Sequence, residues 1–317
     1  MWTKPYGMKE SFLIGGGLIV AGLMLELSVG PVDWNAFRWP VNGIVLAGFL
    51  ALIAVIFLLR KRVYGFQFIG THKAAIPALV YAVVLTIIMG LTRQESLTPS
   101  PSPKGEGSLW INHMLNFWPF VLIYVYMAVI LGQVILQRTL IFQLSTLNLK
   151  RDVPFMLNHL GLFLAMTTAT LGNADMQRLK MITVKGEPEW RALTPQQTFP
   201  SEARLPVAFV EMPIAIELKD FVMETYDDGS PRRFASEVQI LTKTGKNIRA
   251  TIEVNKPVEV DGWKIYQYGY DTKMGAMSQY SILELVSDPW LPLVYTGIDM
   301  MLAGAVCTLL KGKRVKR

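Results

Sequence analysis

The sequence predicts a polytopic α-helical membrane protein of about six spans, with an extracytoplasmic antiparallel β-domain between the last two spans. Hydrophobic residues make up 51% of the 317 residues, charged residues make up only 17%, and mean hydropathy is +0.33. Several apolar runs approach the roughly 20 residues that cross a bilayer core, and one long polar segment interrupts them. This composition excludes a soluble enzyme, a disordered protein and a small secreted domain held by disulfides.

Six apolar segments account for the helical part of this prediction. Each is close to the length that a helix needs to cross the hydrocarbon core. The first segment follows a polar N-terminus without a small-residue cleavage site, so we expect a retained helix rather than a removed signal peptide. The six segments span residues 12–29, 41–59, 74–91, 118–136, 154–171 and 290–310.

The charges of the connecting segments predict the orientation. The N-terminus, residues 60–73, residues 137–153 and the C-terminal tail carry 2, 4, 3 and 5 Lys/Arg, respectively. The alternating segments, 30–40 and 92–117, carry one and two. Because cytoplasmic connections are enriched in Lys and Arg, we expect both termini in the cytoplasm, which agrees with an even number of spans.

The polar segment between the fifth and sixth spans predicts a β-rich domain outside the cytoplasm. Runs of β-branched and aromatic residues alternate there with short turns that contain Gly, and this spacing favours an antiparallel meander or sandwich. The expected strands are 207–226, 234–242, 247–254, 263–270 and 279–286. The expected parts of the chain are a membrane domain over 1–172, the β-domain over 173–288, and the last span with its basic tail over 289–317.

The net charge of +7 and the pI of about 9.4 do not indicate nucleic-acid binding. Residues 173–288 hold 14 Lys/Arg and 17 Asp/Glu, a balance of −3. The positive excess lies at the ends of the apolar segments, where basic residues set topology and contact anionic lipid. The lone cysteine, Cys307, permits no disulfide within the chain and no CxxC redox pair.

The three histidines differ in their surroundings. His72 adjoins Lys73 in a basic cytoplasmic connection, which favours a solvated boundary residue, and interfacial anchoring explains His113 in an external segment. His159 lies inside the fifth span, where a polar side chain is costly and indicates a functional site. Its imidazole could bind metal or haem iron. A histidine hydrogen-bonded across a helix interface, for example to Asn158, is an equally good interpretation of the residues.

Two acidic residues also lie within spans. Glu26 is near the outer end of the first span and is expected to reach water, whereas Asp299 is near the middle of the last span. We expect Asp299 to be protonated or paired with a partner protein, because an unpaired charge in the middle of a bilayer has a high free-energy cost.

Aromatic residues mark one strand of the expected β-domain. Successive residues of a strand point to opposite faces. Tyr266, Tyr268 and Tyr270 are therefore predicted to form a row on one face, and Trp263 points to the other face. Packing in a core or interface is favoured over direct contact with a flat ligand. Sequence motifs of hydrolases, P-loop proteins and dinucleotide-binding proteins are absent from the sequence, so it offers no self-contained catalytic site.

Three stretches, taken together, resemble the ResB/CcsB family of System II cytochrome c biogenesis. They are Asn158-His159-Leu-Gly-Leu-Phe; Val254-Asn-Lys-Pro with the following Gly262-Trp-Lys-Ile-Tyr-Gln; and Asp288-Pro-Trp-Leu-Pro before the last span. The resemblance covers about residues 150–310. The Val-Asn-x-Pro and Gly-Trp-x-x-Tyr-Gln pattern is the most specific part, while a histidine alone would be weak.

The resemblance implies a membrane subunit that binds haem b transiently and helps to deliver it to apocytochrome c. His159 matches the family's axial haem ligand in the span before the external domain. Asn158, Asp299, Trp263 and Tyr266 are further candidates for functional residues. The family pattern has three spans before the external domain, whereas five are predicted here, and the extra spans have no role that the resemblance supplies.

The resemblance also implies partners and a location. The CcsA module of fused family members is absent, so a separate CcsA-type membrane protein is expected to supply the second ligand and the attachment site. The chain would then be at most part of a holocytochrome c synthase (haem lyase) complex in the bacterial inner membrane. Two alternatives remain open: a cofactor-free membrane assembly factor whose β-domain binds client proteins, and a transporter accessory subunit that uses Asp299.

Overall fold

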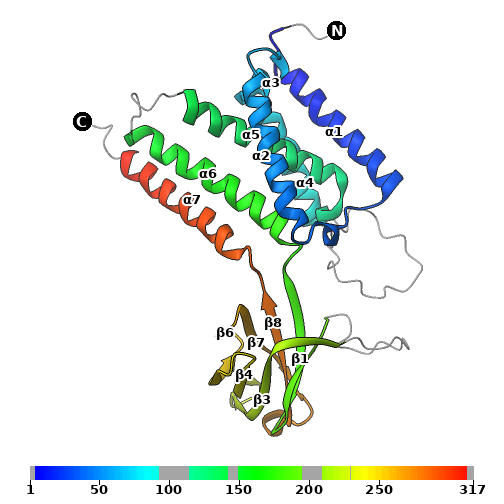
Figure 1. The fold of residues 1–317 in the computed structure, drawn as a ribbon, viewed down its shortest axis with the longest axis vertical. Helices are drawn as coiled ribbons and strands as arrows, with labels where there is room; N and C mark the ends of the chain where they lie inside the picture. The colour runs from blue at the N-terminus through cyan, green and yellow to red at the C-terminus, as the bar shows by residue number, and fades with distance from the viewer. Residues whose placement is uncertain (1–3, 93–113, 142–148, 195–208, 229, 313–317) are drawn as a thin grey trace. The chain divides into compact units, whose positions relative to one another are not determined.

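A computed structural model describes residues 4–92, 114–141, 149–194, 209–228 and 230–312. These residues form two compact units. One unit contains the helices and includes the chain up to Asp175 and from Trp290 onward, and the other contains Met176–Pro289. Figure 1 shows the helices of the first unit and the strands of the second.

The helical unit confirms all six apolar segments. Its helices are long and apolar enough to cross a membrane by length and composition. A short helix, α3 (Tyr64–Ile69), joins two of them. The six long helices are α1 (Met8–Val29), α2 (Val41–Leu59), α4 (His72–Leu91), α5 (Trp118–Ile141), α6 (Leu149–Gly172) and α7 (Leu291–Gly312).

Helices α6 and α7 are far apart in the sequence but pack along each other (Figure 1). Glycines make this close approach possible. A Cβ atom added to Gly161 would lie 2.6 Å from the main-chain oxygen of Gly297, and one added to Gly297 would lie 2.6 Å from that of Gly161. Small residues at such contacts let two membrane helices pack backbone against backbone.

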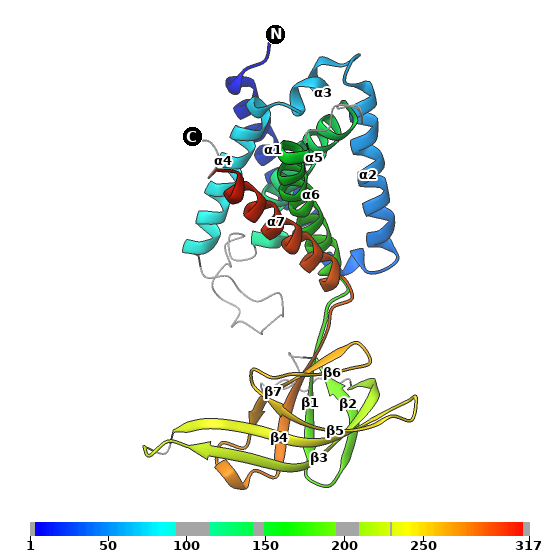
Figure 2. The same ribbon diagram turned by 90° about the vertical axis from the view of Figure 1, so that its left-hand side faces the viewer.

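The second unit is one antiparallel sheet of eight strands, in the order β5-β4-β3-β2-β1-β8-β7-β6. Strands β5 and β7 are not hydrogen-bonded neighbours in this sheet, yet they contact each other, so the sheet coils around its own inner face. Figure 2 shows the long β3–β4 hairpin and the neighbouring β5. The strands are β1 (Gln177–Val184), β2 (Pro188–Leu193), β3 (Phe209–Thr225), β4 (Pro231–Thr242), β5 (Asn247–Glu253), β6 (Val258–Val260), β7 (Trp263–Tyr270) and β8 (Tyr280–Ser287).

The antiparallel β-domain predicted from the sequence is confirmed, and the structure adds β1, β2 and β6 to the five expected strands. Alternate residues of the strands form the core on the inner face, as the period of two requires. Ile216, Ile240, Ile265 and Leu283 are among its fully buried members. Strands β1 and β8 pair along their whole lengths, from Gln177 opposite Ser287 to Val184 opposite Tyr280.

Candidate functional site

The ring of His159 is held by two contacts within its own helix. Its Nδ1 atom lies 2.8 Å from the main-chain oxygen of Phe155, one turn earlier on α6. A carbonyl oxygen can only accept a hydrogen bond, so Nδ1 carries the proton in this contact. The rings of Phe155 and His159 stack with their centroids 3.8 Å apart. Together the two contacts orient the ring, and in a neutral imidazole with the proton on Nδ1 the lone pair lies on Nε2.

His159 lines a pocket between α4, α5 and α6, with a volume of about 220 Å³. All the other residues that line it are apolar, so the imidazole is the one polar side chain in its wall. The other lining residues include Ala75, Ala78 and Leu79 of α4, Met127 of α5, and Leu162 and Met166 of α6. The sequence analysis missed the α4 contribution, although Ala75, Ala78 and Leu79 have the spacing of one helix face.

Asn158 is adjacent to His159 but faces a different helix. Its side-chain nitrogen donates to the main-chain oxygen of Pro154 at 2.8 Å, within α6. A Cβ atom added to Gly304 of α7 would lie 2.7 Å from the same nitrogen, which places Asn158 at the α6–α7 contact. The suggested hydrogen bond between His159 and Asn158 is therefore wrong, because neighbouring residues of a helix point about 100° apart.

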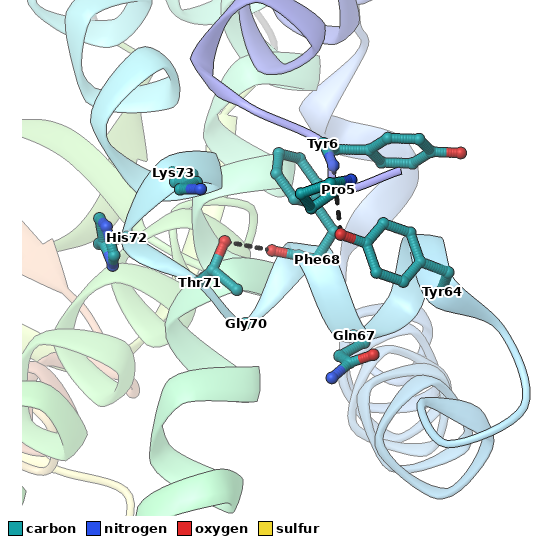
Figure 3. Close-up of a pocket in the computed structure, with 9 residues that line it drawn as sticks. All are labelled: Pro5, Tyr6, Tyr64, Gln67, Phe68, Gly70, Thr71, His72 and Lys73. Carbon is teal, nitrogen blue, oxygen red and sulfur yellow. Dashed lines mark hydrogen bonds between the residues drawn. The ribbon is translucent and has the colours of Figure 1, made fainter. Parts of the chain in front are cut away.

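A second cavity, of about 390 Å³, lies where α1, α3 and α4 begin or end. Figure 3 shows His72 and Lys73 on one side of it and the rings of Tyr6, Tyr64 and Phe68 on the other. The main-chain N–H of Tyr6 donates to the hydroxyl of Tyr64 at 3.1 Å. His72 is exposed, in agreement with a solvated boundary residue. His113 lies outside the described residues.

The two intramembrane acids have opposite surroundings. Glu26 is only 8% exposed, and its carboxylate accepts a 3.1 Å hydrogen bond from the main-chain N–H of Trp118. The expectation that Glu26 reaches water is wrong, because the carboxylate satisfies the first N–H of α5 instead. Asp299 is exposed on α7 and has no hydrogen bond or ion pair with any described residue. A charged side chain in mid-membrane costs about 2.5–3.5 kcal/mol.

The expected row of three tyrosines on β7 is broken by a β-bulge. The register of β7 against β8 shifts between Gln267 and Gly269, so the residues after the shift change face. Lys180 lies over the ring of Tyr268, with Nζ 3.4 Å from the centroid. Tyr270 instead stacks on Phe221, with ring centroids 5.0 Å apart.

Two other aromatic candidates of this strand, Trp263 and Tyr266, lie among residues of the sheet itself. Trp263 is partly buried and packs against the hydrophobic core of the sheet. Tyr266 is half-buried opposite Glu284 of β8. Packing accounts for Trp263, and no described contact distinguishes Tyr266 as a ligand-binding residue.

The Gly-Trp-Lys-Ile-Tyr-Gln stretch has a structural explanation. Asp261 and Gly262 both have positive φ, at 46° and 83°, and join β6 to β7 as the two-residue turn of a hairpin requires. At its other end, the side chain of buried Gln267 donates to Ser281 Oγ at 2.7 Å and accepts from Ser236 Oγ at 2.6 Å. The motif thus supplies a turn and a satisfied polar group inside the sheet.

Asp175, which the sequence analysis did not single out, collects three donors just beyond α6. Oδ2 accepts from the side chains of Asn42 and Trp290, each at 2.7 Å, and Oδ1 accepts from the main-chain N–H of Trp39 at 2.8 Å. Burial alone would raise the pKa of Asp175, but the hydrogen bonds from Trp39, Asn42 and Trp290 outweigh it and lower the pKa below its ordinary value.

The described residues hold no group of three or more His, Cys, Asp or Glu that could bind a metal ion. Two methionines, Met127 and Met166, line the same pocket as His159.

Comparison with known proteins agrees with the resemblance in the sequence. Residues 151–278 match the model of the ResB-like family. This range includes His159 and the Gly-Trp-x-x-Tyr-Gln stretch but not Trp290. Comparison with curated proteins found no match.

Among solved structures, one similar chain is a cytochrome c haem lyase, CcmF. It is 12% identical in sequence, with a TM-score of 0.34, and the match covers 84% of the present chain. The present chain spans 45% of that chain. At this level of similarity the match carries no argument about function.

Proposed function

We propose that this chain, which is ResB-like over residues 151–278, is the membrane subunit of a complex that delivers haem for attachment to apocytochrome c. The observation that carries the proposal is the position of His159. Its imidazole is the one polar side chain among the described residues that line an apolar pocket inside the helical unit. We assign His159 as the axial haem ligand that this chain contributes.

The state of the ring supports this role. Iron binds the lone pair of a neutral imidazole nitrogen, and the other nitrogen commonly donates to a carbonyl oxygen that fixes the ring. The contact from Nδ1 of His159 to the oxygen of Phe155, at 2.8 Å, provides this second interaction. Nε2 has no hydrogen bond with any residue that the structure describes. The ring is therefore orientated for ligation through Nε2.

The size of the pocket supports a shared site. Pockets that enclose a drug-sized ligand have volumes of roughly 300–1,000 Å³, and the pocket at His159 has about 220 Å³. This chain would cover part of one porphyrin face with apolar side chains, and a second protein would cover the remainder. We propose a separate CcsA-type membrane protein as this partner, supplying the second ligand and the site where haem b joins the apocytochrome.

We further propose that both termini are cytoplasmic and that the β-domain lies outside the cytoplasm of a bacterial inner membrane. The distribution of Lys and Arg among the connecting segments supports this orientation. His159 lies seven residues into the span that begins at Asp152, on the side where haem would enter from the cytoplasm. The β-domain would position the partner or the apocytochrome, because its sequence contains neither histidine nor cysteine to bind haem.

The test is a His159→Ala variant, purified with the CcsA-type partner from haem-replete membranes. We expect the Soret band to fall by at least about tenfold, since even second-shell changes cost 10–100-fold. Added imidazole should restore part of it by occupying the vacated space. Asn158→Ala, one residue away at the α6–α7 contact, and His72→Ala are the matched controls.

An unchanged Soret band in His159→Ala would refute the assignment of the ligand. A complex that matures cytochromes without ever showing a Soret band would favour the cofactor-free assembly factor instead.

A further inference from the structure

Among the helices that the structure describes, α7 packs closely on α6, and Asp299 points away from this contact. Gly297 and Gly304 are the buried residues of α7 that contact α6. Each residue of a helix turns by about 100°, so Asp299 lies about 200° around α7 from Gly297. It also lies eight residues, or about 12 Å, from the start of α7 at Leu291, close to the middle of the span.

Asp299 belongs to a continuous stripe of exposed residues on this outer face. The stripe consists of Tyr295, Asp299, Leu302, Val306 and Leu309, at spacings of four, three, four and three. Its apolar members are 52%, 60%, 54% and 74% exposed, in chain order. This alternation of three and four is the pattern by which a helix packs along a second helix with a left-handed crossing. Helix α7 therefore presents a second packing face with a carboxyl group within it.

We propose that this outer stripe binds a transmembrane helix of a different protein, which carries Lys, Arg or His at the depth of Asp299. A carboxyl group inside a bilayer requires a donor or cation as its partner. The described spans of this chain place Lys9, Lys73 and Arg138 at their ends, and the histidine within a span, His159, lines the pocket between α4, α5 and α6. A second copy that packed through the same stripe would oppose one Asp299 with another. The complementary charge must therefore come from another protein.

Photo-crosslinking in intact membranes tests this interface. The photoreactive residue p-benzoylphenylalanine would be placed at Val306, on the stripe, or at Ala305, which is exposed at the same depth but turned by about 100°. We expect a specific product from Val306 and little from Ala305. The captured helix, identified by mass spectrometry, should carry a basic residue near the centre of its span.

Substitutions at Asp299 then test the role of the charge. Asp299→Leu should reduce the Val306 product by about three- to tenfold, the range expected for one hydrogen bond in a membrane. Asp299→Asn should reduce it less. Thr296→Val is the matched control, because the hydroxyl of Thr296 is bonded to Pro292 of the same helix. Asp299→Leu makes the span more apolar, so it should still insert.

The proposal is overturned if Val306 gives no product, if the product is a second copy of this chain, or if the captured helix lacks a basic residue. An Asp299→Leu variant with an undiminished product would also overturn it. The proposed interface does not depend on haem binding, so His159→Ala should leave the Val306 product unchanged. The two proposals, the interface at Asp299 and the haem ligand at His159, are therefore tested independently.

Discussion

The indole nitrogen of Trp290 donates a 2.7 Å hydrogen bond to Oδ2 of Asp175, and so joins the segment after α6 to the residue before α7. Trp290 also packs on Gly172, where an added Cβ atom would collide with the tryptophan side chain. The β-domain is inserted between these two positions. The interaction thus fixes the two chain segments that lead into and out of the domain.

Trp290→Phe should destabilise the helical unit by about 1.5–3 kcal/mol, the usual contribution of a hydrogen bond to a charged group. Thermal unfolding in detergent at pH 7 measures this effect. Trp190→Phe, on an exposed part of β2, is the matched control. Equal unfolding temperatures for the two variants would contradict a stabilising role for the Trp290–Asp175 interaction.

Asp175→Asn should lower the unfolding temperature at neutral pH but not in acid. The pKa of Asp175 is lowered from its ordinary value of 3.8, so its charged form stabilises the folded state above that pH. This stabilisation is lost as the pH falls through the lowered pKa. The difference in unfolding temperature between wild type and Asp175→Asn should therefore shrink below about pH 3.8. A difference that stayed constant from pH 7 to pH 3 would contradict the assigned charge.

Gly161→Val should separate α6 from α7, because its side chain would collide with the main chain at Gly297. Overpacking of this kind costs about 1–3 kcal/mol, which thermal unfolding of the purified protein would detect. Gly48→Val is the control, since a Cβ atom at Gly48 meets nothing within 4 Å. If both valines were equally tolerated, the close contact between the two helices would be disproved.

Ala78→Phe should abolish haem binding without removing the ligand. Ala78 is 1% exposed and lines the His159 pocket, so a phenyl ring there would occupy space that the proposed ligand needs. The Soret absorbance of the complex measures the loss. Val83→Phe, on an outward position of α4 that is 54% exposed, should retain normal absorbance. Normal absorbance in Ala78→Phe would place the haem elsewhere.

The fragment of residues 176–289, produced alone, should be rich in β-structure by circular dichroism and should not bind haem tightly. It forms a compact unit with its own core, and it contains no histidine or cysteine. Its conventional axial candidates are methionine, tyrosine and lysine. A stoichiometric low-spin haem spectrum from the fragment would show that the domain does more than position a partner.

Reporter tags at residue 1 and residue 317 should both report the cytoplasm, and a tag beside Asp228 should report the opposite side. The number of Lys and Arg in alternating connections gives this expectation. An external C-terminus would require a different number of spans and would move the β-domain to the other side.

The sequence by itself determined the class of the protein and its six helices, because long apolar runs have few other stable conformations. It also predicted an antiparallel β-domain, since alternating patterns and turn residues such as Asp261-Gly262 act over short distances. His159 stood out for the same local reason: a polar side chain within an apolar helix is visible without knowledge of its neighbours.

The tertiary structure alone decided what each of these residues faces. Only packing shows that His159 faces α4 and α5 while Asn158 faces α7, or that Glu26 is buried against the start of α5. The bulge that turns Tyr270 inward depends on pairing with β8, and the interaction of Asp175 with Trp290 joins residues 115 positions apart. Such relationships arise from contacts between distant segments, which a local pattern of residues does not encode.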